Sequence, residues 1–330
     1  MVAQRHAFGG ILAPILIAIL LMASLPAKAQ VSTPAAQKAL LKLFQARPTA
    51  VDLKEVGDII VLLRRKVTDN PYDAALRMRL AAYLFQAGDF SGSATELKRA
   101  IAVNPDDYFA HAMLARVLDL SMDDAAADIE FQRALSLKGD NAVALEYYGE
   151  SLLKRGEISQ AVDIFRKACA ISASCDAFCG LSDALLSSRD VAGATKAARQ
   201  AVSADPGSAR AHVSLTKALL VAGDYSCAMR TARQASLLDP ASPESHLALG
   251  RALFAMKEVD RACEEFRQAV SLDPLDAQAR NDLGWALYGR GYVASAVNEL
   301  KLALRLNPHL NEARNNLEIA INGLIGSKRQ

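Results

Sequence analysis

The chain has 330 residues, close to the upper size for a single hydrophobic core, so its length favours two domains or a repeat array. Its 38 basic and 36 acidic residues give a formal net charge of +2. Both excess bases, Arg5 and Lys28, lie in the N-terminal segment, and the rest of the chain is neutral. This balance excludes an electrostatic footprint for nucleic acid or an anionic membrane, and the 6% aromatic content with frequent alanine favours packed helices over a β architecture.

Residues 1–29 are typical of a secretory signal peptide. A basic start precedes an apolar run over Ile11–Leu25, and Ala27-Lys28-Ala29 places small residues where a signal peptidase reads them. The run is short for a membrane span and Pro14 interrupts it. We therefore expect cleavage after Ala29, no stable span afterwards and a periplasmic or secreted protein; an uncleaved anchor is the alternative.

Residues 30–71 contain two helical stretches, Ala35–Ala46 and Val51–Val67, separated by Pro48. They lack the regular pattern of small residues that follows in the chain. We expect an atypical helical pair that caps the first repeat.

Residues 72–308 are organised by a proline that recurs after an acidic or amide residue at a step of 34. The pairs are Asn70-Pro71, Asn104-Pro105, Asp205-Pro206, Asp239-Pro240, Asp273-Pro274 and Asn307-Pro308, and Gly139 and Ala173 stand where two further prolines are expected. Each repeat shows two apolar stripes at helical spacing, split by a short turn. A fixed period of this kind predicts a stacked solenoid of seven repeats.

Small residues recur where the two helices of a repeat must approach closely. The first helix carries them at Ala81, Ala115, Gly149, Ser182, Thr216, Gly250 and Gly284, and the second at sites such as Ala296 and Ala303. Glycine inside a helix costs about 1 kcal/mol relative to alanine, so its recurrence at one site predicts close backbone contact there.

The pattern resembles the tetratricopeptide repeat (TPR) family. In the seventh repeat the family's residues are Leu283-Gly284, Leu287, Ala296, Leu300, Ala303 and Pro308. The resemblance implies an all-α fold, a right-handed superhelical solenoid of stacked antiparallel helix pairs. The family's bulky aromatic early in the first helix is replaced here by Arg77, His111, Leu145, Phe178, His212, His246 and Arg280, which predicts more polar packing at that position.

The fourth repeat is irregular. Its entry turn lacks the proline and is one residue short, with Cys169 before it and Cys175 and Cys179 after it. Because disulfides persist in an oxidising compartment, we expect a possible link across this turn from Cys169 to Cys175 or Cys179. The alternative is three small buried thiols.

Residues 309–330 continue with one more amphipathic stretch, Asn311–Leu324, and a short tail. We expect this stretch to be a capping helix that covers the last repeat's apolar face.

No residue pattern indicates catalysis, a metal or a cofactor. His111, His212 and His246 share one repeat position, and equivalent sites lie about 10 Å apart, too far for joint ligation of one zinc ion. The chain has no phosphate loop, nucleophile elbow or metalloprotease helix motif. We therefore expect a protein that is not an enzyme.

In the TPR family the first helices line a groove that binds protein segments. The resemblance assigns the following groove residues, which form a candidate partner site for a peptide or a helix: Phe85, Arg116, Glu150, Asp183, Lys217, Leu220, Arg251, Phe254, Trp285 and Tyr288. Some of these side chains could instead pack only between neighbouring helices.

With the export signal, the resemblance implies a periplasmic scaffold for protein–protein interaction, similar to TPR proteins of envelope assembly such as pilus assembly or exopolysaccharide secretion. The alternatives are a regulatory or anchoring subunit of a cell-wall enzyme and a carbohydrate-binding solenoid that uses the aromatic C-terminal end.

Overall fold

The computed structural model describes residues 34–45 and 50–327, so the expected signal peptide and its cleavage site lie outside the described residues. Over the described part the chain forms only helices and turns, as predicted for an all-α fold. None of these helices is both long and apolar enough to cross a membrane. The helices are α2 (Pro34–Gln45), α3 (Ala50–Asp69), α4 (Ala74–Gln86), α5 (Phe90–Val103), α6 (Tyr108–Leu120), α7 (Asp124–Leu137), α8 (Ala142–Lys154), α9 (Ile158–Ile171), α10 (Cys175–Ser187), α11 (Val191–Ala204), α12 (Ala209–Val221), α13 (Tyr225–Leu238), α14 (Pro243–Ala255), α15 (Val259–Leu272), α16 (Ala277–Gly289), α17 (Val293–Leu306) and α18 (Asn311–Ser327).

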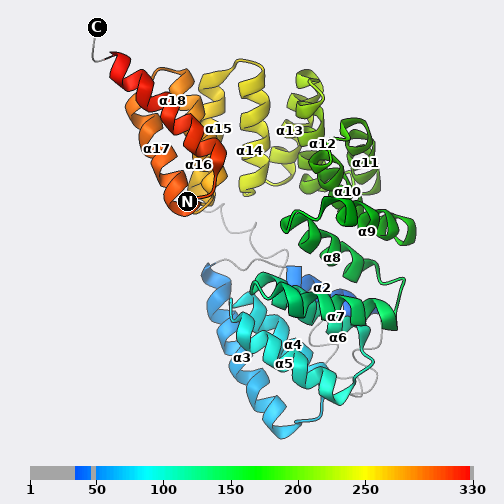
Figure 1. Cartoon of the computed structure of the whole chain (residues 1–330). Helices are drawn as coiled ribbons and strands as arrows, with labels where there is room; N and C mark the ends of the chain where they lie inside the picture. The colour runs from blue at the N-terminus through cyan, green and yellow to red at the C-terminus, as the bar shows by residue number, and fades with distance from the viewer. Residues whose placement is uncertain (1–33, 46–49, 328–330) are drawn as a thin grey trace, which may run out of the picture. The chain divides into compact units, whose positions relative to one another are not determined.

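These helices belong to two compact units that divide between Arg155 and Gly156. Unit 1 contains α2 to α8, and unit 2 contains α9 to α18 (Figure 1). In each repeat we call the even-numbered helix, such as α12, the first helix and the following odd-numbered helix, such as α13, the second.

Most helices begin at a residue whose side chain caps the helix. At Asp107 and Ser208, for example, the side-chain oxygen accepts a hydrogen bond from the backbone N–H three residues on, which satisfies one of the free donors at a helix start. The residue before each later proline acts similarly, since Asp239 Oδ1 accepts from the N–H of Ala241. The recurring sequence of acid or amide, proline and cap therefore ends one helix and starts the next.

The turn inside each repeat has one residue with a left-handed backbone. These residues recur at the repeat period and are Gly88, Met122, Gly156, Arg189, Gly223, Lys257 and Gly291. Glycine adopts this conformation without strain, and at the three other positions a side chain is held in it.

Close approach of the paired helices explains the small residues. A side-chain carbon added at Gly250 would lie 2.5 Å from the ring of Phe266, and one added at Gly284 would lie 2.7 Å from Leu300. In the first full repeat, Ser93 Oγ donates to the carbonyl oxygen of Ala81 at 2.8 Å. The predicted close contact at these sites is confirmed.

In unit 2 the first helices stack on one another. Each of α10, α12, α14 and α16 contacts the next first helix as well as the second helix of its own repeat, whereas successive second helices have no comparable contact. The first helices therefore line the tighter, inner face of this unit.

Both ends of the described chain continue the repeat packing. α2 and α3 pack on α4, and Phe44, Ile60 and Leu63 join one buried core with the apolar side chains of α4. α18 packs on α16 and α17 and buries Ala313 and Ala320 against Leu300. The assignment of these segments as terminal caps of the repeat array stays a prediction.

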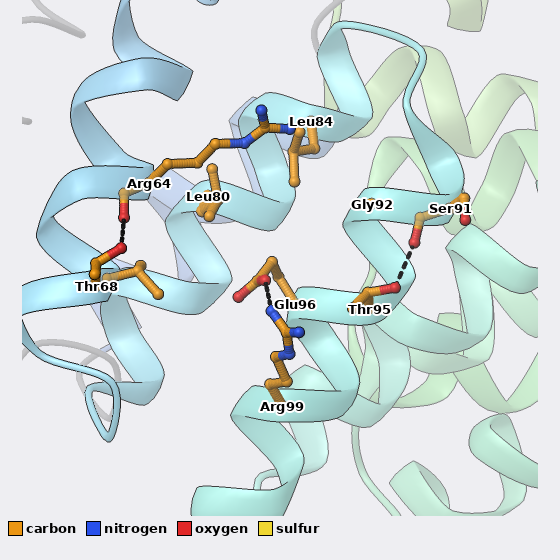
Figure 2. A pocket seen from close by; sticks show the side chains of 10 residues that line it. Arg64, Thr68, Leu80, Leu84, Ser91, Gly92, Thr95, Glu96 and Arg99 are labelled. Atoms are coloured by element: carbon orange, nitrogen blue, oxygen red, sulfur yellow. Dashed lines mark hydrogen bonds and ion pairs between the residues drawn. The ribbon is translucent and has the colours of Figure 1, made fainter.

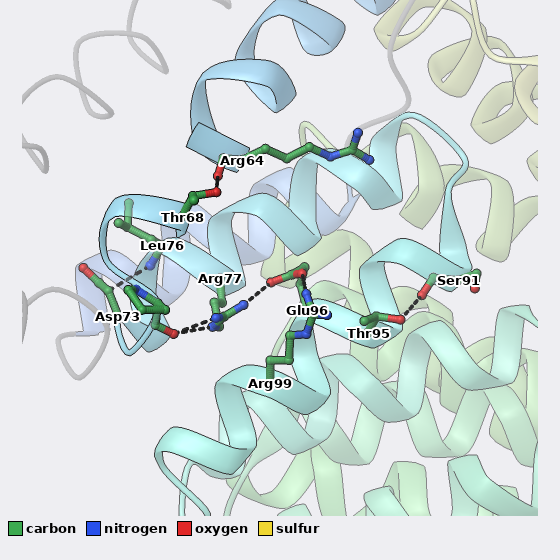
Figure 3. Close-up of polar contacts among 10 residues, drawn as sticks. Arg64, Thr68, Asp73, Leu76, Arg77, Ser91, Thr95, Glu96 and Arg99 are labelled. Atoms are coloured by element: carbon green, nitrogen blue, oxygen red, sulfur yellow. Dashed lines mark hydrogen bonds and ion pairs between the residues drawn. The ribbon is translucent and has the colours of Figure 1, made fainter. Parts of the chain in front are cut away.

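The basic residue that replaces the family's aromatic has a specific partner. Arg77 donates from Nε and Nη2 to the carbonyl oxygen of Pro71 at 2.9 and 2.6 Å, and its Nη1 pairs with Glu96 of α5 at 2.7 Å (Figure 3). We call the first of these the proline–base contact, because it joins a basic side chain to the proline carbonyl six residues earlier. It also occurs at His111, His212, His246, Arg280 and Arg314.

In four of these repeats the basic side chain also pairs with an acid on the second helix. Besides Arg77 with Glu96, the pairs are His111–Glu130, His246–Glu265 and Arg280–Glu299, at 2.5, 2.7 and 2.9 Å. In both histidines one ring nitrogen lies within hydrogen-bond distance of the acid and the other within hydrogen-bond distance of the proline carbonyl oxygen. His212 has Thr231 at the position of the acid, and its Nδ1 has no hydrogen-bond partner.

Candidate protein-binding surfaces

The groove residues of unit 1 mainly contact the chain itself. The Phe85 ring centroid lies 5.3 Å from that of Phe44 and 5.4 Å from that of Phe90. Arg116 of α6 pairs with Glu150 of α8 at 3.1 Å. These side chains connect neighbouring helices of the unit, which is the alternative that the sequence left open.

The charged groove residues of unit 2 also pair along the stack of first helices. Asp183 of α10 lies 3.5 Å from Lys217 of α12, and Arg251 Nε of α14 donates to Asp282 of α16 at 2.6 Å. Each of these ion pairs joins the first helices of two adjacent repeats. Within each pair the two charges are opposite, so each pair has no net charge.

Asp282 is the most buried acid of this face. Besides Arg251, it accepts hydrogen bonds from Gln278 Nε2 at 3.0 Å and Asn281 Nδ2 at 3.2 Å. Burial raises the pKa of Asp282, and the charge of Arg251 opposes this shift. The network continues to α18, where Asn316 Nδ2 donates to Asn281 at 2.9 Å.

Half-buried apolar side chains are present on the same helices as these ion pairs. Leu220 and Phe254 follow Lys217 and Arg251 by three residues, one on each of two adjacent first helices. We define the first-helix row of unit 2 as the following residues: Asp183, Lys217, Leu220, Arg251, Phe254, Trp285 and Tyr288. Its side chains are held by neighbours before any partner arrives, which lowers the entropy cost of binding.

The aromatic end of the row is partly covered. Trp285 and Tyr288 stack with ring centroids 5.5 Å apart, and a side-chain carbon added at Gly323 of α18 would lie 3.1 Å from the Tyr288 ring. One side of Tyr288 therefore faces the terminal helix. The carbohydrate-binding alternative for this aromatic end stays a prediction.

Cys175 and Cys179 of the irregular repeat form no disulfide in the structure, nor do Cys227 and Cys263. The disulfide expected from Cys169 across the turn is not formed there. Instead, Cys175 and Cys179 of one helix form a side-chain hydrogen bond, and this bond, with one from Ser208, lowers the pKa of Cys175 to about 7. The bond to Cys175, together with burial, raises the pKa of Cys179.

No group of three histidine, cysteine or acidic side chains in the described part of the chain could hold a metal ion. The histidines singled out by the sequence are instead engaged in the proline–base contacts.

A pocket in unit 1 was not expected from the sequence. It has a volume of about 400 Å³ and lies between α3 and α5, over α4 (Figure 2). Its lining residues are Arg64, Val67, Thr68, Leu80, Leu84, Ser91, Gly92, Thr95, Glu96 and Arg99. We call it the α3–α5 pocket. The residues come from three helices and no single sequence pattern joins them, so only the folded chain brings them together.

Comparison with known proteins agrees with this architecture. Family models described as tetratricopeptide repeat match residues 78–142 and 247–311 and, for a second model, residues 185–252. Together these matches cover more than half of the chain. No curated protein sequence matched the chain with statistical significance.

Several solved structures share the fold. The APC/C hetero-tetramer Cut9-Hcn1 is 15% identical with a TM-score of 0.65, over 91% of this chain and 58% of that one, so this chain spans little more than half its length. PilF of Pseudomonas aeruginosa is 20% identical with a TM-score of 0.52, over 61% of this chain and 92% of that one. PilW, titled a type IV pilus biogenesis factor, is 18% identical with a TM-score of 0.54, over 61% of this chain and 94% of that one. With the family-model matches and the stacked helix pairs, these likenesses lead to one conclusion: the chain belongs to the tetratricopeptide repeat family.

Proposed function

We propose that the protein is a non-catalytic scaffold in the bacterial periplasm and that it binds a protein partner on the first-helix row of unit 2. The observation that carries the proposal is the pairing of charges on this row. Because Asp183 pairs with Lys217 and Arg251 pairs with Asp282, we expect the apolar side chains of the same first helices, Leu220 and Phe254, to hold the partner. A peptide or helix with apolar anchors at helical spacing fits such a row.

The proposed location rests on the N-terminal sequence and on the structural neighbours. An export signal is the reading that fits residues 1–29, and two pilus-related TPR proteins, PilF and PilW, share the fold. We therefore propose a role in assembling an envelope system, with pilus assembly as the first one to examine.

Affinity capture tests this proposal. The mature chain would be immobilised and exposed to an envelope extract beside a variant carrying Leu220→Gln and Phe254→Gln. Proteins that depend on the row should be recovered about tenfold less with the variant, since central apolar anchors dominate binding energy.

The matched control carries Leu237→Gln and Leu275→Gln, two side chains that are each 75% exposed and belong to no groove position. Equal far-UV circular dichroism would show that all three proteins are folded. A partner that is lost equally from the control and the row variant would contradict the proposed site.

A further inference from the structure

The α3–α5 pocket contains a guanidinium that the fold does not use. Arg64 is exposed, and its side chain makes no hydrogen bond or ion pair with any part of the chain that the structure describes. Its backbone carbonyl accepts from Thr68 Oγ1, while its side chain extends across the pocket beside Leu80 toward Leu84 (Figure 2). A charge in this position is available to a ligand.

The pocket carries net positive charge. Its one acid, Glu96, is 8% exposed and already pairs with two bases, Arg77 at 2.7 Å and Arg99 at 2.6 Å (Figure 3). The lining thus has two bases, Arg64 and Arg99, for one carboxylate, and Arg64 extends away from Glu96 toward Leu84 (Figure 2). The N–H of Gly92 is bonded to Asp89, so the arginines, and not the start of α5, supply the positive potential.

The rest of the lining has two characters. The floor is aliphatic, since Val67, Leu80 and Leu84 are buried there. The rim has the hydroxyl of Ser91, which has no hydrogen-bond partner among the described residues, and that of Thr95, which donates to the carbonyl oxygen of Ser91. A ligand that fits must therefore combine an aliphatic part with an anionic, hydrogen-bonding part.

The next groove along unit 1 lacks these features. One repeat later, the residues in register with Thr68, Ser91, Gly92 and Thr95 are Ala102, Ala125, Ala126 and Ile129. The residue in register with Arg99 is Arg133, which pairs with Asp106 at 3.2 Å. The hydroxyl groups of the α3–α5 pocket thus have no counterpart in the next repeat.

We propose that the α3–α5 pocket binds an aliphatic carboxylate, presented as an acidic side chain next to a leucine-like side chain in a segment of a protein partner. The carboxylate pairs with Arg64 and accepts from Ser91, and the aliphatic group contacts Leu80 and Leu84. The site uses none of the residues of the first-helix row, so it would give the scaffold a second point of attachment independent of that row.

Methyl nuclear magnetic resonance of the full mature chain with labelled leucine methyl groups tests the site directly. The probes are N-acetyl-leucyl-glutamate amide, 4-methylpentanoate and the neutral 4-methylpentanamide. Both carboxylates should shift the methyl signals of Leu80 and Leu84 at about 10 mM, a concentration that reports even millimolar binding. The neutral amide should bind about fivefold or more weakly, since it cannot pair with Arg64.

Three variants make the test specific. Arg64→Gln should weaken binding of both carboxylates about fivefold, and Thr95→Ile, which copies the residue of the next repeat, should abolish it by filling the pocket. Lys98→Gln, which removes the base in register with Arg64, should change nothing. Absence of shifts at Leu80 and Leu84 in the wild-type chain, or unchanged binding in Arg64→Gln, would overturn the site. Tighter binding of the peptide than of 4-methylpentanoate supports a protein source, and the reverse order would overturn that assignment.

Discussion

The repeats whose entry turn contains a proline differ from the two repeats in the middle of the chain, α8–α9 and α10–α11, whose entry turn has no proline. Every proline-entered repeat has a basic side chain that bonds the proline carbonyl, as Arg77 and His246 do. In the middle repeats, Gly139 and Ala173 replace the proline, and Leu145 and Phe178 replace the base. Proline and base are therefore present together or absent together.

This difference explains why a basic side chain replaces the aromatic side chain that is usual at this position in the family. The proline ends the second helix and leaves its carbonyl oxygen at the turn without an intrahelical donor. A basic side chain on the next first helix supplies that donor and fills the space of the aromatic. Where no proline is present, an apolar side chain, Leu145 or Phe178, is at the position of the base.

The largest expected effect comes from removing a base. Arg280→Met breaks the bonds to Pro274 and Glu299, and should lower the free energy of unfolding of unit 2 by about 1.5–3 kcal/mol, because hydrogen bonds to charged groups contribute this much. Trp285 lies on the same helix, so its fluorescence in a urea titration measures the loss.

The control is Phe178→Leu at the same repeat position of a middle repeat. An apolar replacement without lost hydrogen bonds should cost under about 1.5 kcal/mol. If the two variants lose equal stability, the proline–base contact does not distinguish the two kinds of repeat.

The middle repeats should instead show thiol reactivity. Because the pKa of Cys175 is lowered to about 7, its thiolate fraction rises through neutral pH. Its alkylation by iodoacetamide should therefore be about tenfold faster at pH 8 than at pH 6, followed by mass spectrometry of the peptides. Cys179, with its raised pKa and buried side chain, should react far more slowly over this range and serves as the internal reference. Equal rates at the two cysteines would contradict the described pair.

The smallest expected effect comes from supplying the acid that His212 lacks. His212 bonds Pro206 but has no acid for its Nδ1, because Thr231 is at that position. Thr231→Glu should supply the acid, as in the His246–Glu265 pair, and raise the stability of unit 2 by about 0.5–1.5 kcal/mol in the same titration. A loss of stability would mean that the existing bond between Thr216 and Thr231 matters more than the missing one.

The sequence predicts the helices well, because its signals are local or strictly periodic. These signals are the spacing of the prolines, the capping residues and the small residue at Gly250. Each reflects a contact whose partner is at a fixed position in the repeat. The proline–base contact was not predicted, although the sequence contains a signal for it. Arg77 and Arg280 each follow a proline by the same number of residues.

The candidate site was less predictable. Arg116 and Glu150, and Asp183 and Lys217, are opposite charges one repeat apart, and their register could have predicted that they pair. The α3–α5 pocket could not be predicted, because it depends on which side chains leave space between three helices. The cysteine contact was also missed, since a link across the turn was considered and the pair one helical turn apart was not.

Photo-crosslinking in the bacterial envelope tests the central claim, that a protein partner lies on the first-helix row of unit 2. A photoreactive phenylalanine analogue would replace Phe254 in one protein and the exposed Leu237 in another. The account predicts a discrete crosslinked protein from position 254 that is absent from position 237. Crosslinks of equal yield from both positions, or none from position 254 while the partner is still captured, would contradict it.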